Sequence, residues 1–435
     1  MAWRSTEAFA GWRRLRPVAR RLIQVRALRS IAQGALAVDF VLDLKAMYWT
    51  ALRVGALLAG AELVGAALGL AVGVLSDRFG RRRFLLAYQA ALAVAAVAVL
   101  IRPSSWVLTA AAVSVGFGLG ANGGAGPFGP SEQAWLAQEV ADAERGRVFS
   151  LNSAVGFWGM GIGSLLGGAV GWWSRWLAGP ERYQPLFWVV LILALVNYAQ
   201  IAGLRESLPG PASRPGGAGG TQAAAAIAAD VDPAEPARRR RENTALALLV
   251  GVNALNALAI GIAGPILPYW FALRYGVGPQ ALGPVYGGMF LVTGLASLVA
   301  GEYAARRGLV RSVVAMRVVA LLLFVGLPFL PSFGWAAAAY TLRSVLNRGS
   351  AGARQAFGVG LVRDARRGLA SGLNLASMRV PGAVGPVLAG WLMGIGVLAL
   401  PIFVAAGLQL AYVVLFATVL GRYEAPRTSG GRLAS

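Results

Sequence analysis

Long apolar runs alternate with short links along nearly the whole chain. The runs are close to the length of roughly 20 residues that an α-helix needs to cross the hydrocarbon core of a bilayer. Many links contain glycine, proline or arginine, and charged groups stay out of hydrocarbon because burying them there is costly. The pattern predicts about twelve membrane-spanning helices, near residues 29–51, 54–76, 83–101, 105–126, 147–172 and 184–204 in a first set and 244–272, 280–304, 311–330, 334–356, 369–395 and 399–420 in a second.

The composition supports a membrane protein. The 435 residues are 57% hydrophobic and only 13% charged, with a mean hydropathy of +0.62, whereas soluble domains carry about 25% charged residues. Cysteine and histidine are absent, which excludes disulfides, thiolate chemistry and imidazole catalysis. The sequence contains no nucleophile–base pair and no metal-ligand cluster, so we expect neither an enzyme nor a bound metal or cofactor.

The net charge of +22 comes almost entirely from arginine. Arginines follow alternate apolar runs and crowd residues 1–28 and 238–241, which is the distribution typical of cytoplasmic loops. It predicts that both chain ends are cytoplasmic and that the basic surface meets anionic lipid headgroups rather than nucleic acid. Residues 1–28 are expected to form either an amphipathic helix at the membrane surface or a solvated basic tail.

The two sets of runs are separated by residues 205–243. This segment contains proline–glycine pairs, an alanine run and the arginines of 238–241, a composition typical of a flexible linker. We therefore expect a basic arm (1–28), a first six-helix bundle (29–204), the linker (205–243), a second six-helix bundle (244–420) and a cytoplasmic tail (421–435).

The halves repeat each other in sequence. EQAW at 132–135 recurs as RQAF at 354–357, and LN at 151–152 recurs as LN at 373–374. The offset is constant, since 354 − 132 and 373 − 151 both equal 222. Parallel repeats of this kind are known in secondary transporters.

The link between the second and third runs reads GVLSDRFGRRR at 73–83. It resembles the G-x-L-x-D-R-x-G-R-R loop of the major facilitator superfamily of secondary transporters. A weaker copy at 301–311 keeps glycines and arginines, but Ala305 replaces the aspartate. The resemblance covers residues 26–420. It implies an all-α polytopic membrane protein with twelve transmembrane helices in two pseudo-symmetric bundles, which moves a small solute by alternating access.

The resemblance also implies a charge network at the cytoplasmic face that pairs the two halves. Its members would be Gly73, Asp77, Arg78, Gly80 and Arg81, with Glu132 or Glu139 as the acidic partner. The alternative is a basic loop that only sets topology, in which case Asp77 is dispensable.

Three carboxylates fall inside apolar runs and are candidates for proton coupling. Asp39 lies near the middle of the first run, Asp43 lies one turn further along the same face, and Glu62 lies in the second run. A carboxylate isolated in hydrocarbon is stabilised in its protonated form, as a coupling site requires. For Asp43 we favour the alternative of an ion pair with Lys45 near the outer surface. For Glu62 the alternative is a hydrogen bond between helices that its neutral form donates.

Arg343 and Arg379 lie near the middle of the tenth and eleventh runs. An arginine at that depth needs a wet cavity or a counter-charge, so each either binds an anionic group of the solute or forms a structural ion pair across the halves. The family places its first, fourth, seventh and tenth helices around the cavity. By resemblance, the further cavity candidates are Asn122, Asn253, Asn256 and Asn347.

The fourth run contains GLGANGGAGP at 118–127, which predicts a flexible or broken helix. It lacks the arginine that drug antiporters of the superfamily usually carry there. Three functions remain open: uptake of a small organic anion, export of lipophilic compounds, and a non-transporting receptor or scaffold on the same fold. We expect a monomer of the cell membrane whose partners are a small solute and protons.

Overall fold

The computed structural model describes residues 15–122, 129–141, 144–177, 179–206, 235–307, 309–349 and 367–419, and the secondary structure in this part of the chain is helical. The first half contains α2 (Pro17–Ala46), α3 (Ala51–Phe79), α4 (Arg81–Ile101), α5 (Ser105–Val115), η1 (Leu119–Asn122), α6 (Gly129–Gln138), α7 (Arg145–Gly168), α8 (Val170–Trp173), η3 (Gly179–Tyr183) and α9 (Gln184–Ala202). The second half contains α11 (Glu235–Ala263), α12 (Leu267–Tyr275), α13 (Pro279–Arg307), α14 (Leu309–Gly326), η5 (Leu327–Phe329), α15 (Phe333–Gly349), α17 (Arg367–Gly394) and α18 (Leu400–Thr418).

Each of the twelve expected runs overlaps at least one of these helices. The run 105–126 contains α5 and η1, the run 147–172 contains most of α7 and of α8, and the run 244–272 contains parts of α11 and α12. Residues 123–126 of the fourth run and 350–356 of the tenth lie outside the described chain.

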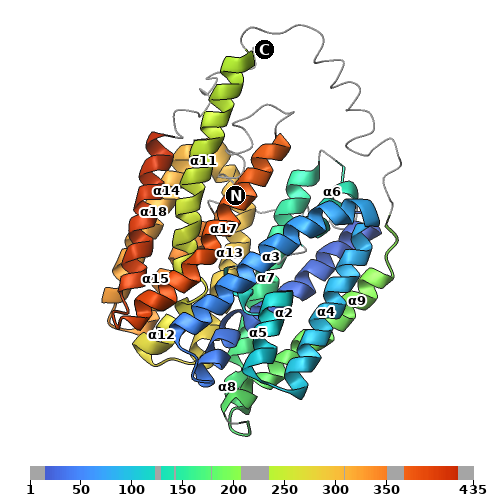
Figure 1. The fold of residues 1–435 in the computed structure, drawn as a ribbon, viewed down its shortest axis with the longest axis vertical. Helices are drawn as coiled ribbons and strands as arrows, with labels where there is room; N and C mark the ends of the chain where they lie inside the picture. Colours follow the sequence, from blue (N-terminus) through green and yellow to red (C-terminus); the bar gives the residue numbers. More distant parts are fainter. Residues whose placement is uncertain are drawn as a thin grey trace, which may run out of the picture.

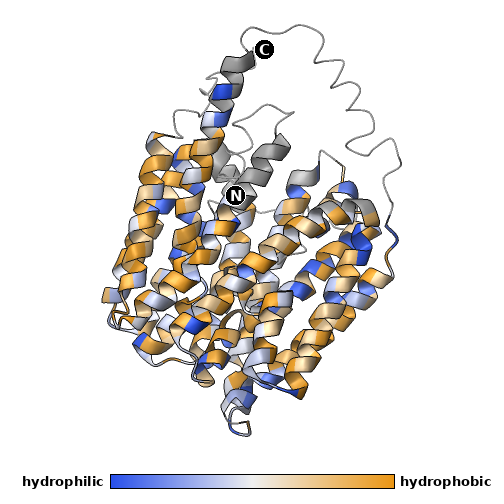
Figure 2. Ribbon diagram, viewed as in Figure 1, coloured by the Kyte–Doolittle hydropathy of each residue, from blue (hydrophilic) through white to orange (hydrophobic). Residues whose placement is uncertain are grey.

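Eight stretches of the described chain are long and apolar enough to cross a membrane. They lie in α3, α4, α7 to α8, η3 to α9, α11, α13, α14 to η5 and α18. Many large apolar side chains on them are exposed, and hydrophobic colouring dominates these helices in Figure 2. The prediction of an all-helical polytopic membrane protein is confirmed.

The two halves lie side by side (Figure 1), with the blue-to-green helices forming one bundle and the yellow-to-red helices forming the other. Within the halves, α2 packs along α7 and α11 packs along α17. Across the halves, α3 packs along α17 and α7 packs along α13. The same helix pairs therefore recur in both halves, as the constant sequence offset predicts.

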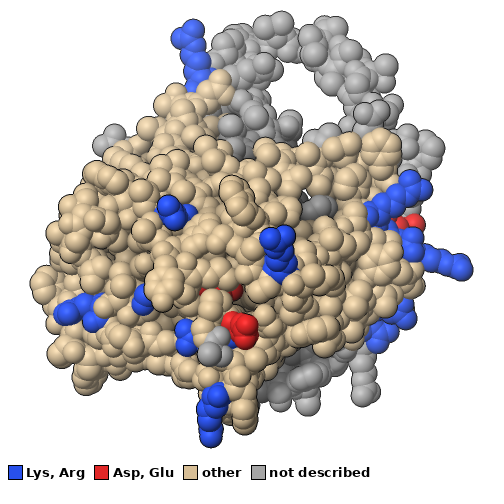
Figure 3. Space-filling model, turned by 60° about the horizontal axis from the view of Figure 1, so that its bottom comes forward, with Lys and Arg blue, Asp and Glu red and all other residues tan. Residues whose placement is uncertain are grey.

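The bundle has two distinct ends. We call the end where α3 meets α4 and where α9 stops the basic end, because Arg81, Arg82 and Arg83 open α4 there. The other end, called the turn end, carries the connections from α2 to α3, from α7 to α9, from α12 to α13 and from α17 to α18. Figure 3 looks onto the turn end, where scattered charged groups lie in a mostly neutral surface.

Glycines bring the halves into backbone contact at the turn end. At the crossing of α7 and α13, a Cβ added to Gly283 would overlap the backbone of Gly168. At the crossing of α3 and α17, Gly390 lies against the backbone of Ala51. Small residues at a helix interface allow this close approach, so the halves are held together at the turn end.

A second set of contacts reinforces this closure. The Tyr269 hydroxyl of α12 donates a hydrogen bond to the Trp49 carbonyl in the α2–α3 turn at 3.2 Å. The Lys45 ammonium at the end of α2 lies over the Tyr269 ring, 5.7 Å from its centroid. Lys45 thus faces an aromatic ring of the second half, and the expected pair between Lys45 and Asp43 is not formed in the described part of the chain.

Helix α2 begins well before the expected start of the first run. Residues 17–28, expected in a surface helix or a solvated tail, form the first turns of α2. Leu22 and Ile23 are buried there in an apolar cluster with Trp135 of α6 and Ile201 of α9. The apolar positions between the arginines thus face a core inside the first half. Residues 1–14 lie outside the described chain.

The fourth run is broken, as its glycines predict. Helix α5 ends at Val115, and Gly116 and Gly118 both adopt positive φ angles, of 81° and 80°. Side chains are strained in this region of backbone space, whereas glycine is not. The chain then continues through η1, which packs against α2.

The glycine crossing between α7 and α13 can be tested with Gly283→Leu. The added side chain has no room against the Gly168 backbone, so we expect the turn end to open. Spin labels on introduced cysteines at Trp176 and Arg274, in a chain that has no cysteine of its own, would report longer distances.

The matched control is Gly288→Leu on the same helix, where an added Cβ meets nothing within 4 Å. An unchanged distance distribution in Gly283→Leu protein that elutes as a folded species would contradict this account of the crossing.

Candidate functional site

Charged side chains inside the helical bundle form the candidate site. Because hydrocarbon does not solvate charge, each such group needs a partner inside the protein or a wet cavity. The buried charged residues in the described chain are Arg26, Arg29, Asp39, Asp43, Glu132, Arg317 and Arg343. Of these, only Asp39, Asp43, Glu132 and Arg343 were candidates from sequence.

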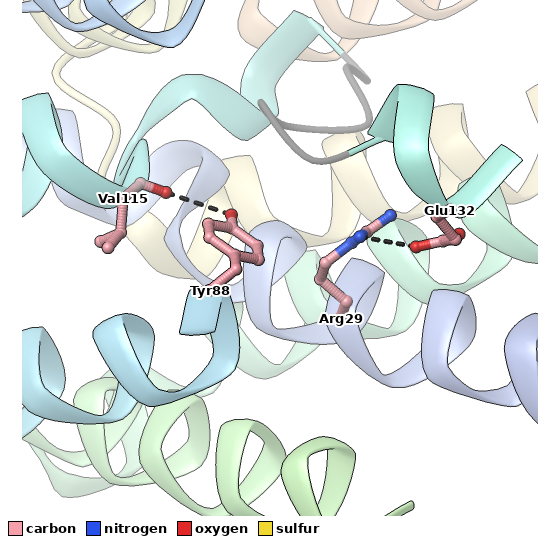
Figure 4. A network of polar contacts seen from close by, with 4 residues as sticks. All are labelled: Arg29, Tyr88, Val115 and Glu132. Atoms are coloured by element: carbon pink, nitrogen blue, oxygen red, sulfur yellow. Dashed lines mark hydrogen bonds and ion pairs between the residues drawn. The ribbon is translucent and has the colours of Figure 1, made fainter. Parts of the chain in front are cut away.

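Arg29 and Glu132 form a buried ion pair within the first half (Figure 4). The Arg29 guanidinium of α2 lies 2.6 Å from the Glu132 carboxylate in the first turn of α6, with the two side chains 1% and 2% exposed. Arg26, one turn before, packs against α7 where Gly156 leaves room for its guanidinium. From the sequence, Glu132 was expected to be the acidic partner of the arginines in the α3–α4 loop. In the structure it pairs with Arg29 and so holds α6 against α2.

Tyr88 of α4 lies beside this pair (Figure 4) and donates a hydrogen bond to the Val115 carbonyl at 3.2 Å. Val115 is the last residue of α5, so its carbonyl has lost its helical partner at the break. The same region encloses a small pocket lined by Arg29, Gln33, Tyr88, Phe117 and Gly118. The break in the fourth run and the buried Arg29 therefore lie next to each other.

The α3–α4 loop is tight. Gly73, Asp77 and Arg78 lie in the last turns of α3, Gly80 (φ 91°) makes the reversal, and Arg81 opens α4. The side chains of Asp77 and Arg78 lie outside the described ones, so their roles stay predictions.

The small residue before Asp77 has a defined contact. The Ser76 hydroxyl lies 3.0 Å from that of Ser131 on α6, which packs the end of α3 against the helix that carries Glu132. Glu139, the other expected acidic partner, instead lies 3.8 Å from Arg16, whose side chain is 72% exposed.

Glu206, which sequence reasoning missed, holds the start of α4. Its two carboxylate oxygens accept hydrogen bonds from the backbone N–H groups of Arg81 and Arg82, both at 2.8 Å. In return, the Arg82 guanidinium donates to the carbonyls of Ile201 and Ala202 at the end of α9. Each charge therefore caps the helix end whose dipole it complements.

Asp39 and Asp43 lie one turn apart on α2 near the turn end, and both are buried. Neither oxygen of Asp39 has a hydrogen-bond partner among the described residues. Its carboxylate lies in the space that a Cβ atom on Gly167 of α7 would occupy. Arg182 in η3 attracts both carboxylates electrostatically, and its guanidinium lies over the Tyr183 ring. The pair therefore lies between α7 and the hairpin that leads into α9.

Glu62 and Arg379 form an ion pair across the two halves. The Arg379 guanidinium of α17 lies 3.5 Å from the Glu62 carboxylate of α3. Both residues were candidates, for proton coupling and for the cavity respectively. The structure brings them together near the middle of the α3–α17 contact, as in the structural alternative for Arg379.

Arg343 on α15 is surrounded by aromatic rings. Its guanidinium lies 3.7 Å from the centroid of Phe324, a cation–π contact that is strengthened by desolvation, and only 4% of the residue is exposed. Arg348, five residues later on α15, lies over Phe290 and close to Phe157 of the first half, at 4.6 and 5.9 Å. Arg348 was missed, although it follows Asn347 in the same run, and it lies where the halves meet.

The asparagine candidates have different environments. Asn256 is fully buried and accepts a hydrogen bond from Arg317 of α14 at 3.0 Å. Its amide oxygen is therefore a polar partner of a buried guanidinium. Asn253 is buried one turn earlier on α11, and Asn347 is half-buried on α15. The side chain of Asn122, at the end of η1, lies outside the described ones.

Comparison with known proteins places this arrangement in a family. Residues 25–252 match the family model of the Major Facilitator Superfamily. Since that is more than half of the chain, the protein belongs to this superfamily and is a non-enzymatic secondary transporter of small solutes.

Solved structures share the fold across almost the whole chain. A crystal structure of a point mutant of the nucleoside transporter NupG matches with a TM-score of 0.71 and 12% identity, covering 92% of this chain and 98% of that one. A D-xylose-proton symporter matches with a TM-score of 0.66 and 13% identity, covering 92% and 97%. A bacterial homologue of the human lysosomal transporter Spinster, in an inward-facing and unoccupied conformation, matches with a TM-score of 0.65 and 15% identity, covering 93% and 95%. At these identities the likeness shows the fold alone.

The buried pair can be tested with Glu132→Gln, which leaves the Arg29 charge buried without its partner. Breaking a buried pair from one side costs about 3–5 kcal/mol, so we expect a loss of that order in the free energy of unfolding, measured by denaturant titration in detergent. The control Glu139→Gln leaves behind Arg16, whose side chain is 72% exposed and hydrated by water, so it should cost about 1 kcal/mol or less. Equal effects of the two substitutions would show that the Arg29–Glu132 pair contributes no more to the free energy of unfolding than the pair of Glu139 with Arg16.

Proposed function

We propose that the protein transports a small anionic solute across the cell membrane by alternating access, with proton coupling at Asp39. The observation that carries the solute class is the charge of the second half. Between Thr244 and Tyr423, the only acidic residues are Glu302 and Asp364, and neither falls in the middle of a span. The helices of this half nevertheless carry Arg317, Arg343, Arg348 and Arg379.

The arginines of the second half differ in the groups that stabilise their positive charge. Arg379 receives its counter-charge from Glu62 of the other half, and Arg317 donates to the neutral Asn256. Arg343 lies on the Phe324 ring, which stabilises a cation but does not neutralise it. No carboxylate among the described residues forms an ion pair with Arg343. An anionic solute between the halves would supply a negative charge on the side of the second half, since guanidinium groups bind carboxylate or phosphate well. This balance disfavours a cationic lipophilic cargo.

The contacts between the halves support the transport cycle. The glycine crossings and the Tyr269–Trp49 bond lie at the turn end. If the arginine pattern places the basic end in the cytoplasm, together with both termini, this conformation is closed to the outside. The opposite state requires that these crossings separate while the basic end closes.

Asp39 is the proposed proton site because it is buried without a hydrogen-bond partner among the described residues. Glu62 is less suited, since Arg379 stabilises its charged form. Asp43 lies next to Asp39 on the same helix face, and Arg182 acts on both carboxylates. Protonation of Asp39 would therefore change the electrostatic interaction between α2 and the hairpin that leads into α9. One structural neighbour is named a proton symporter, but the residue-level proposal rests on the burial of Asp39.

The solute class and the coupling can be tested together by thermal stabilisation of the purified protein. A panel of small anions, neutral solutes and cations would be screened across pH. We expect hits among the anions only, with an affinity that depends on pH in the wild type and not in Asp39→Asn.

Glu181→Gln, which alters an exposed acid at the turn end, is the matched control and should keep the pH dependence. Stabilisation by cations alone would overturn the solute class, and a pH dependence unchanged in Asp39→Asn would overturn the coupling site. A complete lack of stabilising solutes would favour a receptor or scaffold.

The gating role of the α3–α4 loop gives a separate prediction. We expect Asp77→Asn to abolish transport of a solute found in that screen while the protein still inserts and elutes normally, because the loop would lose the acid of its charge network. Glu144→Gln, an exposed acid at the same end, should transport normally. If Asp77→Asn transports at the wild-type rate, the loop serves topology alone.

A further inference from the structure

A basic groove lies between the α3–α4 junction and the end of α9. It has a volume of about 710 Å³ and is lined by residues 79–80, 82–83 and 202–206. Figure 2 shows strongly hydrophilic segments at these adjoining ends of α4 and α9. Apart from Gly80 of the α3–α4 loop, none of the residues that line this groove has a role in the proposed transport steps.

The groove is rigid because two helix ends cap each other through it. Glu206 accepts from the first backbone N–H groups of α4, and Arg82 donates to the last carbonyls of α9. Arg21 of α2 adds a longer bond to the Gly203 carbonyl at 3.4 Å. The groove is therefore a formed feature of the first half and not a gap between loose loops.

The charge of the groove is positive. Its ionisable lining residues are Arg82, Arg83, Arg205 and Glu206. The Glu206 carboxylate is already engaged by two backbone N–H groups at 2.8 Å. Arg83 and Arg205 are exposed, so two guanidinium groups remain available to an incoming anion.

The depth of the groove identifies the anion. The apolar stretch of α4 starts at Arg81 and that of α9 stops at Ala202, so the groove lies where the hydrocarbon gives way to headgroups. Phe79, at its edge, is 55% exposed and offers an apolar surface to the glycerol and first methylenes of a lipid. Guanidinium groups at this depth recognise phosphate and attract anionic lipid.

We infer that this groove is a binding site for the phosphate headgroup of an anionic phospholipid. Arg83 and Arg205 hold the phosphodiester, and Phe79 contacts the start of the acyl chains. A lipid bound there braces the end of α9, from which residues 207–234 lead to the second half, against the loop that carries Asp77. The inference depends on the membrane fold and not on the identity of the transported solute.

The test uses the full-length protein in detergent with added lipid. We expect phosphatidylglycerol to raise the melting temperature and phosphatidylcholine to leave it unchanged. In the double variant Arg83→Gln/Arg205→Gln, the affinity for phosphatidylglycerol should fall roughly 30-fold, as expected for the loss of two surface arginines. The double variant Arg53→Gln/Arg175→Gln, which removes two exposed arginines at the turn end, should keep the wild-type affinity.

Two further measurements separate the sources of phosphate and the effects of folding. Inorganic phosphate and glycerol phosphate at the same concentration should not stabilise the protein through the groove. Stabilisation by either that equals that of the lipid and is lost in the Arg83→Gln/Arg205→Gln variant would overturn the lipid assignment, whereas stabilisation that the variant keeps would arise at the transport site. A photoreactive phosphatidylglycerol should crosslink to a peptide that contains Phe79 or Arg205 in the wild type. Crosslinking confined to other peptides, or undiminished binding to the Arg83/Arg205 variant, would also overturn it.

Discussion

The cost of placing charge in hydrocarbon governs the interior of this protein. A guanidinium stays ionised at any physiological pH, so a buried arginine cannot escape the cost by losing its proton. Each must be met by a carboxylate, an amide or an aromatic face, and the structure shows all three: Glu132 for Arg29, Asn256 for Arg317 and Phe324 for Arg343. These partners lie on different helices, so the same requirement that solvates the charges also fixes how the helices are assembled.

The two halves meet this requirement differently. The first half contains its own acids. The Arg29–Glu132 pair joins α2 to α6, the helix that follows the break in the fourth run. The second half contains almost none within its spans and takes Glu62 from its neighbour. The charge of Arg379 is thus balanced by Glu62 only when the halves are together, so charge as well as packing opposes their separation at the α3–α17 contact.

Much of the fold was predictable from sequence because helix length, apolar content and arginine placement report directly on the bilayer. The break at Gly116 was predictable for the same reason, since the glycine-rich stretch lies inside an apolar run. The start of α2 was not, because the arginines between Leu15 and Arg26 resemble a surface arm until their apolar neighbours are seen in a core. The partners of the charges were also hidden: nothing in the sequence indicates that Glu132 belongs to Arg29, or that Glu206 caps a helix that begins over a hundred residues earlier.

The glycine crossings at the turn end have a consequence for the speed of the cycle. A joint built from backbone atoms has no interlocked side chains, so closing it freezes no rotamers and opening it releases none. At these glycine positions closure therefore costs little side-chain conformational entropy, and they contribute little to the barrier between the two states. The contacts of Tyr269 and Lys45 beside them, in contrast, do order side chains. A joint of bulky interdigitating residues would hold one state more firmly and turn over more slowly.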